Sequence, residues 1–506
     1  MASRAREEAR KKGYKQTIDP DEARRKREEY AVEVRKSKRE ERIVKRRVSG
    51  SAASFPALDG AQLMVDDWTP DARGGAQLSK LDSYVRSMFT NNQQQRFENA
   101  VRIGLLLDTD ADPPIDQIVR AGVVPLMAQF LDNTSSPKLQ YQAALVLGNI
   151  CCGTLTHVQA VAESGAIPKL VNLVSSEHEP IREQAISALA NISAEGPSFR
   201  DLVLDHKAME GLLLAMYNHP SRTTLRISSW ALSNFCRGSP PPRSFLVRKA
   251  VPTIAALLVN DDEDVVAEAC YALSRLSDIG SDLVEEILEN NVARKLVDYM
   301  LSENQIVQRW SIRTVGSIAG GNDDHAQVVI DNGALPNILE LLNIPRKSVR
   351  KDACWVLSNI TAGCTEQIQA VLDEGIIPAL VYMMGISDFD VKKEITWVLS
   401  NAACEGTRSQ VGYLVDCGVI PALCDMLEAP DAVVVEVTID AVTEILKVGQ
   451  RMMMNDVNSY ALLLEGSGGL EKLVRLEQHE RDTISDKASS IVETFFSSEI
   501  EVRTKE

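Results

Sequence analysis

The chain of 506 residues has a formal net charge of −16, with 44% hydrophobic and 5% aromatic residues. This composition fits several globular domains or one long repeat protein, and the absence of about 18 consecutive apolar residues argues against membrane insertion. The N-terminus is too charged for a secretory signal. The nine cysteines show no C-x-x-C motif or metal-ligand spacing, which indicates buried free thiols in a reducing compartment.

Charge is divided unevenly along the chain. Residues 1–50 hold 18 Lys and Arg against 10 Asp and Glu, a net charge of +8, and the remainder carries −24. Either the basic arm docks on the acidic body, or each part seeks an outside partner of opposite charge. Asp19 and Pro20 predict a helix start. The helix that follows, to about Arg42, has too few apolar residues to be stable alone.

We expect four segments: a basic arm at 1–48, a flexible linker at 49–80, a repeat body at 81–497 and a polar tail at 498–506. The linker is rich in Ser, Ala, Gly and Asp. About 30 flexible residues have a root-mean-square reach on the order of 30 Å. That reach would let the cluster at residues 45–47 fold back onto the body.

A five-residue pattern, which we call the Trp/Asn frame, recurs in the body. Its clearest copies are WALSN, WVLSN and WVLSN, which end at Asn234, Asn359 and Asn401. Weaker copies end at Asn149, Asn191, Arg275, Ser317 and Glu444. Successive frames lie 41 to 43 residues apart, and a period of about 40 to 47 residues in a helical sequence is typical of armadillo or HEAT repeats. The sequence therefore predicts an all-α solenoid.

The repeats also share a Gly-x-x-Pro motif between helices. It occurs at Gly122, Gly165, Gly333, Gly375 and Gly418. Glycine ends one helix by adopting positive φ, and proline is tolerated in the first turn of the next helix. Each repeat should therefore hold a short first helix, a second helix, and a long third helix that carries the frame, with the third helices forming a concave ladder. Residues 458–480 depart from this pattern and are predicted to form an atypical terminal repeat.

The residue types of the ladder predict its ligand. Asn amides can hydrogen-bond the backbone of an extended peptide, and Trp rings form slots for Lys or Arg stems, with a cation–π attraction of about 0.5–2 kcal/mol each. Nearby carboxylates would hold the charged tips. The alternative is that these Trp and Asn residues are core filler and surface polar groups. Three copies in one register, beside an internal basic segment, favour binding of a Lys/Arg-rich peptide.

The chain resembles the importin-alpha family of nuclear import adaptors over nearly its whole length. The resemblance lies in the basic arm that ends at Lys45, Arg46 and Arg47, in PPIDQIVRAG at 113–122, in the frames, in SFRD at 198–201 and in GGLEK at 468–472. It implies a right-handed superhelical armadillo solenoid of about ten repeats, preceded by an importin-beta-binding arm.

The resemblance also implies partners. Importin-beta would bind the arm, cargo with basic nuclear localisation signals would bind the groove, and an export receptor of the CAS type would bind the C-terminal repeats. The arm residues expected to bind importin-beta are Arg24, Arg25, Lys26, Arg27, Arg35, Lys36, Lys38 and Arg39. The protein would shuttle between cytoplasm and nucleus through nuclear pores. No cofactor is expected, and the acidic body opposes direct nucleic-acid binding.

Two binding sites follow from the family's motifs. The major site maps onto Asn149, Gly153, Asn191, Glu195, Trp230, Asn234, Asp264 and Glu268. The minor site maps onto Asp323, Trp355, Ser358, Asn359, Glu394, Trp397 and Asn401.

The major site departs from the family pattern. Leu145 and Ser187 stand where Trp is expected, while Val158 and Glu195 replace Thr and Asp in the lysine pocket. Only one of the three expected Trp rings is left to stack on cationic side chains, so the major site should lose binding free energy on the order of 1–3 kcal/mol. Basic signals would then depend unusually on the minor site, or the major site would accept a narrower set of peptides.

Arg275 and Arg313 occupy frame positions between the two sites. They would either repel a basic cluster and so keep the two clusters of a bipartite signal apart, or pair with neighbouring acids. Trp310, one turn before Arg313 on the same predicted helix, is expected to face the core.

Autoinhibition follows from an arm and a groove in one chain. A tethered competitor in the groove has an effective concentration on the order of millimolar, and importin-beta would remove it. The alternatives are an armadillo scaffold, which has no reason to carry the arm, and a specialised adaptor without general signal binding. An enzyme is not expected, because the six His show no Ser/His/Asp grouping and there is no phosphate-binding motif.

Overall fold

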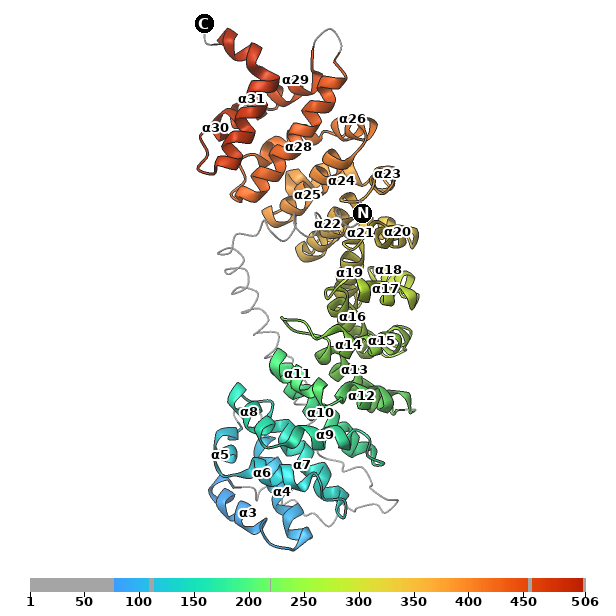
Figure 1. The fold of residues 1–506 in the computed structure, drawn as a ribbon, viewed down its shortest axis with the longest axis vertical. Helices are drawn as coiled ribbons and strands as arrows, with labels where there is room; N and C mark the ends of the chain where they lie inside the picture. Colours follow the sequence, from blue (N-terminus) through green and yellow to red (C-terminus); the bar gives the residue numbers. More distant parts are fainter. Residues whose placement is uncertain (1–76, 109–112, 219, 454–456, 504–506) are drawn as a thin grey trace. The chain divides into compact units, whose positions relative to one another are not determined.

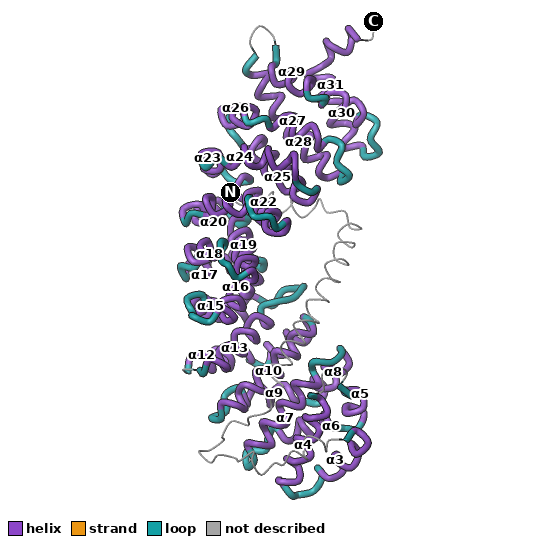
Figure 2. Tube along the Cα trace, turned by 180° about the vertical axis from the view of Figure 1, so that it is seen from behind, coloured by secondary structure: helices purple, strands orange, loops and turns teal. Residues whose placement is uncertain are grey.

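The computed structural model describes residues 77–108, 113–218, 220–453 and 457–503. The regular elements in these ranges are helices joined by short loops (Figure 2), so the predicted all-α class is confirmed. They divide into two compact units, which we call the early unit, residues 77–279, and the late unit, residues 280–503. The arm, its expected helix and nearly all of the expected linker lie outside the described residues.

The early unit opens with a helical pair and continues with four repeats. The opening elements are η3 (Leu78–Lys80), α3 (Leu81–Ser87) and α4 (Gln93–Leu107). The first two repeats comprise α5 (Ile115–Arg120), α6 (Val123–Phe130), α7 (Pro137–Ile150), α8 (Leu155–Glu163), α9 (Ala166–Leu173) and α10 (Glu179–Glu195). The next two comprise α11 (Pro197–Asp205), α12 (Ala208–Tyr217), α13 (Arg222–Phe235), α14 (Ser244–Val247), η4 (Arg248–Ala250), α15 (Val251–Leu257) and α16 (Glu263–Ser277).

The late unit holds five repeats of three helices. The first three comprise α17 (Ser281–Glu289), α18 (Ala293–Tyr299), α19 (Gln305–Ala319), α20 (Asp323–Asp331), α21 (Ala334–Leu342), α22 (Lys347–Thr361), α23 (Thr365–Asp373), α24 (Ile376–Ile386) and α25 (Phe389–Glu405). The last two comprise α26 (Arg408–Asp416), α27 (Val419–Met426), α28 (Ala432–Arg451), α29 (Ser459–Gly466), α30 (Gly469–Leu476) and α31 (Asp482–Arg503).

The glycines of the Gly-x-x-Pro motif adopt the predicted positive φ. Gly122, with φ of 82°, directly precedes α6, and Pro125 falls in the first turn of that helix. The other four predicted glycines, and Gly468, adopt the same left-handed conformation before a second helix. Lys207 and Asn291 take positive φ at the equivalent places. The turn conformation is therefore a property of the repeat, which glycine favours because it has no Cβ.

The core of each unit runs along its third helices. In the early unit α10 packs between α7 and α13, and in the late unit α25 packs between α22 and α28 (Figure 1). Apolar residues of α10, such as Ile181, Ala185 and Leu189, are buried at helical spacing. At the C-terminal end, α31 covers α28 and α30. Within each unit, α10 and α25 are therefore each held from both sides, which fixes the side chains of their frames.

Two searches of the described residues concern other classes of function. No single helix there is apolar and long enough to cross a membrane, although α23 and α24, with a 75° bend between them, together meet the criteria of length and composition. The same residues hold no group of three or more His, Cys, Asp or Glu side chains arranged for a metal ion. All nine cysteines are free thiols.

Candidate functional site

The frame asparagines connect neighbouring repeats. The Nδ2 of Asn191 donates to the carbonyl of Gly148 at 3.0 Å. Asn359 donates in the same way to Gly316 at 2.8 Å, and Asn401 donates to Ser358 at 2.9 Å. Each acceptor lies on the preceding third helix, 43 residues earlier in the chain. The bond orients the amide, so Oδ1 keeps a set direction in which to accept a hydrogen bond.

The other two asparagines of the predicted major site differ from these three. Asn149, at the end of α7, is half-buried. Asn234, on α13, is buried with 2% of its surface exposed, and its Nδ2 has no hydrogen-bond partner among the described residues. The sequence predicted one equivalent role for all five asparagines. The structure instead shows one shared arrangement for Asn191, Asn359 and Asn401.

The tryptophans of the frame are half-buried on their third helices, α13, α22 and α25. Trp355 lies directly against α19: a Cβ built on Gly316 would come within 2.1 Å of its ring. The guanidinium of Arg313 lies 5.6 Å from the centroid of the same ring. The late unit thus holds an indole seated on the neighbouring helix and already next to a cation, which is the geometry of a cation–π contact.

The two positions that lack Trp are also half-buried on their third helices, with Leu145 on α7 and Ser187 on α10. Gly148 corresponds to Gly316, because each gives its carbonyl to a frame asparagine. A Cβ built on Gly148, however, has only atoms of Ala188 as its three nearest neighbours, the closest at 3.5 Å. No ring covers this helix where the late unit has Trp355, as far as the described residues show.

The carboxylates predicted to serve the major site have partners within the early unit. Glu268 accepts a hydrogen bond from the Ser233 hydroxyl at 2.5 Å, and Asp264 lies 3.4 Å from the Arg226 guanidinium. Glu195 is the last residue of α10 and is half-buried. Cargo lysines would therefore have to share Glu268 and Asp264 with groups of the chain itself.

A buried carboxylate that sequence reasoning missed lies beside them. Asp262 has a 6% exposed side chain, and its Oδ2 accepts from Nε of both Arg222 and Arg226 at 2.6 Å. Its Oδ1 caps α16 by accepting from the Asp264 amide at 3.1 Å. The hydrogen bond from Arg226, with a smaller contribution from Arg222, lowers the pKa of Asp262 from 3.8 to about 2. Only the DDED run at the helix start hinted at this role.

The pocket near Gly153 is built around a histidine. A Cβ on Gly153 would come within 2.2 Å of Nδ1 of His157, so only glycine leaves room for that ring. His157 accepts from the Thr154 amide at 3.0 Å through Nδ1 and therefore donates through Nε2 to Asp116, 2.8 Å away. The hydrogen bond from His157 lowers the pKa of Asp116. Val158, which replaces the family's Thr, is fully buried.

The remaining residues of the minor site occupy one region of the late unit. The Ser358 hydroxyl donates to the Trp355 carbonyl at 2.8 Å. Glu394 is buried on α25, one turn before Trp397. Asp323 begins α20, and its backbone carbonyl accepts from Gln367 at 2.7 Å.

The two arginines between the sites pair with neighbouring acids, as one of the two interpretations held. Arg275 lies 3.9 Å from Asp278 and 5.1 Å from the centroid of Tyr271. Arg313 lies 4.0 Å from Asp352. Trp310, which was expected to face the core, is only half-buried, and the Arg309 guanidinium lies 5.1 Å from its ring centroid.

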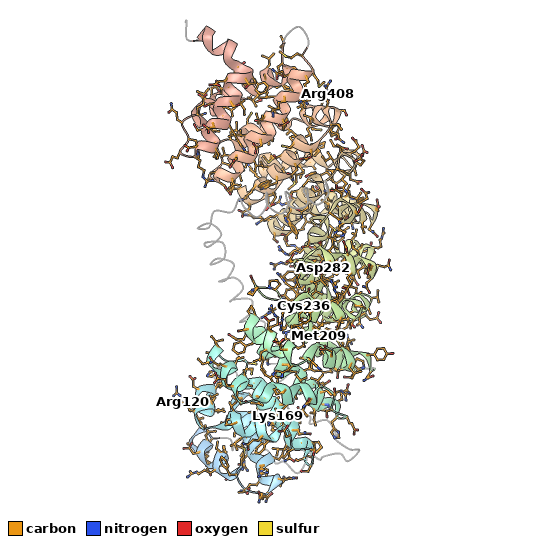
Figure 3. The ribbon with its side chains drawn as sticks, viewed as in Figure 1. Arg120, Lys169, Met209, Cys236, Asp282 and Arg408 are labelled. Carbon is orange, nitrogen blue, oxygen red and sulfur yellow. The ribbon has the colours of Figure 1, made fainter. Side chains whose placement is uncertain are left out.

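A fully buried arginine holds the SFRD motif. Arg200 donates to the carbonyls of Arg237 at 2.6 Å and Pro240 at 3.0 Å, and it pairs with Asp201 at 2.8 Å. The Arg237 guanidinium in turn donates to the Ala194 carbonyl at 2.6 Å. Cys236, labelled in Figure 3, is also buried and directly follows α13. Arg200 thereby ties α11 to the loop that follows α13, and Arg237 ties that loop to the end of α10.

The arm residues predicted to bind importin-beta or to occupy the groove, including Lys45, Arg46 and Arg47, lie outside the described residues. The structure therefore places only the body's contribution to the site.

Comparison with known proteins identifies the family. A model of the importin beta binding domain matches residues 10–101. The Armadillo/beta-catenin-like repeat matches 111–152, 157–194, 322–362, 364–404 and 407–447. An atypical Arm repeat matches 458–506, as predicted for the terminal repeat.

Several curated relatives match nearly the whole chain. Importin subunit alpha-3 of Arabidopsis thaliana is 39% identical over 503 residues, covering 98% of this chain and 93% of that protein. Importin subunit alpha-B of Dictyostelium discoideum is 42% identical over 501 residues, covering 98% and 95%. The chain belongs to the importin-alpha family. Importin-alpha proteins are nuclear import adaptors, and the match at residues 10–101 gives this member an importin-beta-binding domain.

One solved structure supports the fold of this importin-alpha member independently. The crystal structure of an engineered protein has a TM-score of 0.74 and 24% identity, covering 82% of this chain and 98% of its own. At that identity the likeness concerns the fold alone. Family membership places the protein in the cytoplasm and nucleus in general terms.

Proposed function

We propose that this importin-alpha protein binds Lys/Arg-rich nuclear localisation signals along the third helices of its repeats. The observation that carries the proposal is the repeated amide arrangement of Asn191, Asn359 and Asn401, which in the late unit lies one helical turn after Trp355 and Trp397. Oriented amides suit the backbone of an extended peptide, and indoles suit its cationic side chains. The residues mapped above as major and minor sites are the proposed contacts.

The late unit is proposed as the stronger site. It keeps two complete Trp/Asn frames, on α22 and α25, whereas the major site in the early unit has Leu145 and Ser187 at two of its three expected Trp positions. The pairing of Arg226 with Asp262 and Asp264 further limits the affinity of the early unit for cationic side chains, because an arginine of the chain already compensates the charge of those carboxylates.

We also propose that the arm regulates the groove. The segment at 1–48 would bind importin-beta, and Lys45, Arg46 and Arg47 would compete with cargo until importin-beta removes them. Through these exchanges the protein would shuttle through nuclear pores, with an export receptor of the CAS type at the repeats from about α26 onward. The body at 81–497 would hold cargo without catalysing a reaction, and without a cofactor or nucleic acid.

The test is the affinity of a labelled bipartite basic peptide for the full chain and for the variant Lys45→Ala, Arg46→Ala, Arg47→Ala. We expect the variant to bind several-fold more tightly, because a tethered competitor is gone. Equal affinities would refute autoinhibition while leaving cargo binding intact. No binding by either protein would refute signal recognition and favour an armadillo scaffold or a specialised adaptor, for which the missing tryptophans at 145 and 187 are the specific argument.

A further inference from the structure

The start of α22 in the late unit differs from the starts of α19, α25 and α28. Those three helices have Asn304, Asp388 and Asp431 at their N-caps. The N-cap of α22 is Arg346, and the first turn of this helix contains no acidic residue. A guanidinium cannot accept a hydrogen bond from the first N–H groups of a helix, and its charge opposes the helix dipole. The first turn of α22 is therefore uncapped and positively charged.

This turn places an exposed serine among four cations. Ser348 is the second residue of α22 and is exposed. Arg346 and Lys347 come directly before it, and Arg350 and Lys351 follow within three residues. The body of the chain is acidic as a whole, so a basic run of this density is a local feature with its own chemistry.

The pattern Arg-Lys-Ser-x-Arg occurs twice in the chain, at residues 35–39 of the arm and at residues 346–350. Kinases select their substrates partly by charge, and a kinase with an acidic substrate-binding surface accepts a serine that Arg and Lys flank on both sides. The uncapped first turn of a helix opens at a lower free-energy cost than its middle. Ser348 can therefore be presented to such a kinase by fraying of one turn.

Ser348 shares a face of α22 with the frame residues of the proposed minor site. Trp355 and Asn359 follow it by 7 and 11 residues, which is a spacing of two and three helical turns. At 1.5 Å per residue, Ser348 and Trp355 are about 10 Å apart along the helix axis. A negative charge on Ser348 would therefore lie on the face that carries the frame, two turns before the indole.

We propose that Ser348 is phosphorylated by a serine kinase that recognises basic sequences, and that the phosphate strengthens binding of Lys/Arg-rich peptides at the minor site. Only the second part rests on the proposed function. In the reaction the Ser348 Oγ attacks the γ-phosphorus of ATP. The Oγ–P bond forms, the bond from the γ-phosphorus to the bridging oxygen breaks and releases ADP, and the hydroxyl proton passes to a base of the kinase.

The phosphate reverses the charge at the start of α22. Phosphoserine carries about −1.5 to −2 charges at pH 7 and is stabilised at a helix N-terminus. Lys351, one turn after Ser348, lies within reach for an ion pair, whereas Lys347 already pairs with Asp390 at 2.8 Å. The phosphate thus compensates cations that would otherwise repel a basic peptide. At about 10 Å in water this change should tighten binding about 2- to 5-fold at about 50 mM salt.

The first test asks whether the native full chain is phosphorylated at this serine. The chain with residues 45–47 replaced by Ala is incubated with magnesium, ATP and the catalytic fragment of protein kinase C, and phosphorylated residues are mapped by mass spectrometry. We expect phosphate on Ser348. Ser37, in the first copy of the motif, gives the reference rate. Ser409 should stay unmodified, because it is also the exposed second residue of a late-unit helix, α26, but has only Arg408 beside it.

The second test measures the affinity of a labelled all-Lys/Arg peptide by fluorescence anisotropy. The kinase-treated chain is compared with Ser348→Ala treated in the same way, so phosphates elsewhere are common to both. We expect the chain with Ser348 to bind about 2- to 5-fold more tightly at about 50 mM salt, with a smaller difference at about 500 mM. Without kinase, Ser348→Ala should bind like the parent, and Ser348→Glu should bind more tightly than both.

The outcomes separate this inference from the proposed function. Absence of phosphate from Ser348 overturns the modification site, whether or not Ser37 is modified. If Ser348 is phosphorylated but the treated chain and treated Ser348→Ala have equal affinities, the effect on the minor site is overturned. If no peptide binds any form of the chain, signal recognition is wrong, while the mass spectrum still decides whether Ser348 is a modification site.

Discussion

Substitution of the two equivalent glycines by alanine should have opposite effects. In Gly316→Ala the new methyl group would lie 2.1 Å from the Trp355 ring, so the ring must move by about 1.4 Å to restore a carbon–carbon separation of about 3.5 Å. In Gly148→Ala the methyl group would meet Ala188 at 3.5 Å, an ordinary contact. Both glycines lie within long third helices, so both substitutions bring the same gain in helix propensity.

The magnitudes follow from these two terms. Alanine in place of glycine inside a helix stabilises by about 1 kcal/mol, and overpacking costs about 1–3 kcal/mol. Gly148→Ala should therefore raise the free energy of unfolding by up to about 1 kcal/mol, whereas Gly316→Ala should leave it unchanged or lower it by up to about 2 kcal/mol. Because Gly316→Ala displaces Trp355, it should also weaken binding of an all-basic peptide by about 2- to 30-fold.

Hydrogen exchange of each unit and fluorescence anisotropy with the peptide measure the two effects in the full chain. Hydrogen exchange is preferred to a single unfolding midpoint, because repeat proteins need not unfold in one step. If Gly316→Ala protects the late unit as well as Gly148→Ala protects the early unit, and the peptide affinity is unchanged, then Trp355 is not seated on α19 as described and the comparison of the two surfaces fails.

Three further predictions concern other residues. Trp397→Ala should weaken binding of a basic peptide more than Trp230→Ala, because the repeat before Trp397 has a complete frame whereas the repeat before Trp230 has Ser187 in place of Trp. A larger loss of affinity from Trp230→Ala in anisotropy measurements would contradict the stronger late site. Asp262→Asn keeps a cap for α16 but loses both ion pairs. Because the pKa of Asp262 is lowered to about 2, these ion pairs stabilise the fold above pH 4, by about 1–2 kcal/mol after allowing for the exposed arginines. This stabilisation disappears as the pH falls toward 2. The difference in unfolding free energy between this variant and the parent, measured in urea at pH 7, 5 and 3, should therefore be smaller at pH 3 than at pH 7, and a constant difference would refute the assignment. Arg200→Met should destabilise the early unit by about 3 kcal/mol, because it leaves the Arg237 and Pro240 carbonyls without a donor, whereas hydrogen exchange of the late unit should not change.

The repeat architecture could be predicted because its signals are local and recurrent. A glycine before most second helices and a frame near the end of the third helices indicate where helices begin and end, and the structure shows these boundaries. The connections between repeats could not be predicted. The bonds from Asn191 to Gly148 and from His157 to Asp116 join residues 43 and 41 positions apart, and a shift of one residue in repeat stacking would change every such partner.

The same limit applies to the residues predicted for the site. Residue type showed that an Asn and a Trp at helical spacing favour a peptide ligand, but not that Asp262 and Asp264 share Arg226. The carboxylate that a lysine would seek depends on which cation already occupies it, and that cation comes from another repeat. Sequence reasoning therefore located the frames but could not predict the partners of the acids beside them.

The asparagine ladder has two roles that any experiment must separate. Asn401 uses one N–H to hold the Ser358 carbonyl at 2.9 Å, and removing such a bond typically costs about 1 kcal/mol, or more where the acceptor is left buried. Asn401→Ala would thus weaken both the contact between α22 and α25 and the hydrogen bonds offered to a peptide. A loss of affinity in that variant does not by itself measure recognition. A second variant at a frame position that is not an asparagine, such as Trp397→Ala, is therefore needed beside Asn401→Ala to test the ligand chemistry of the groove.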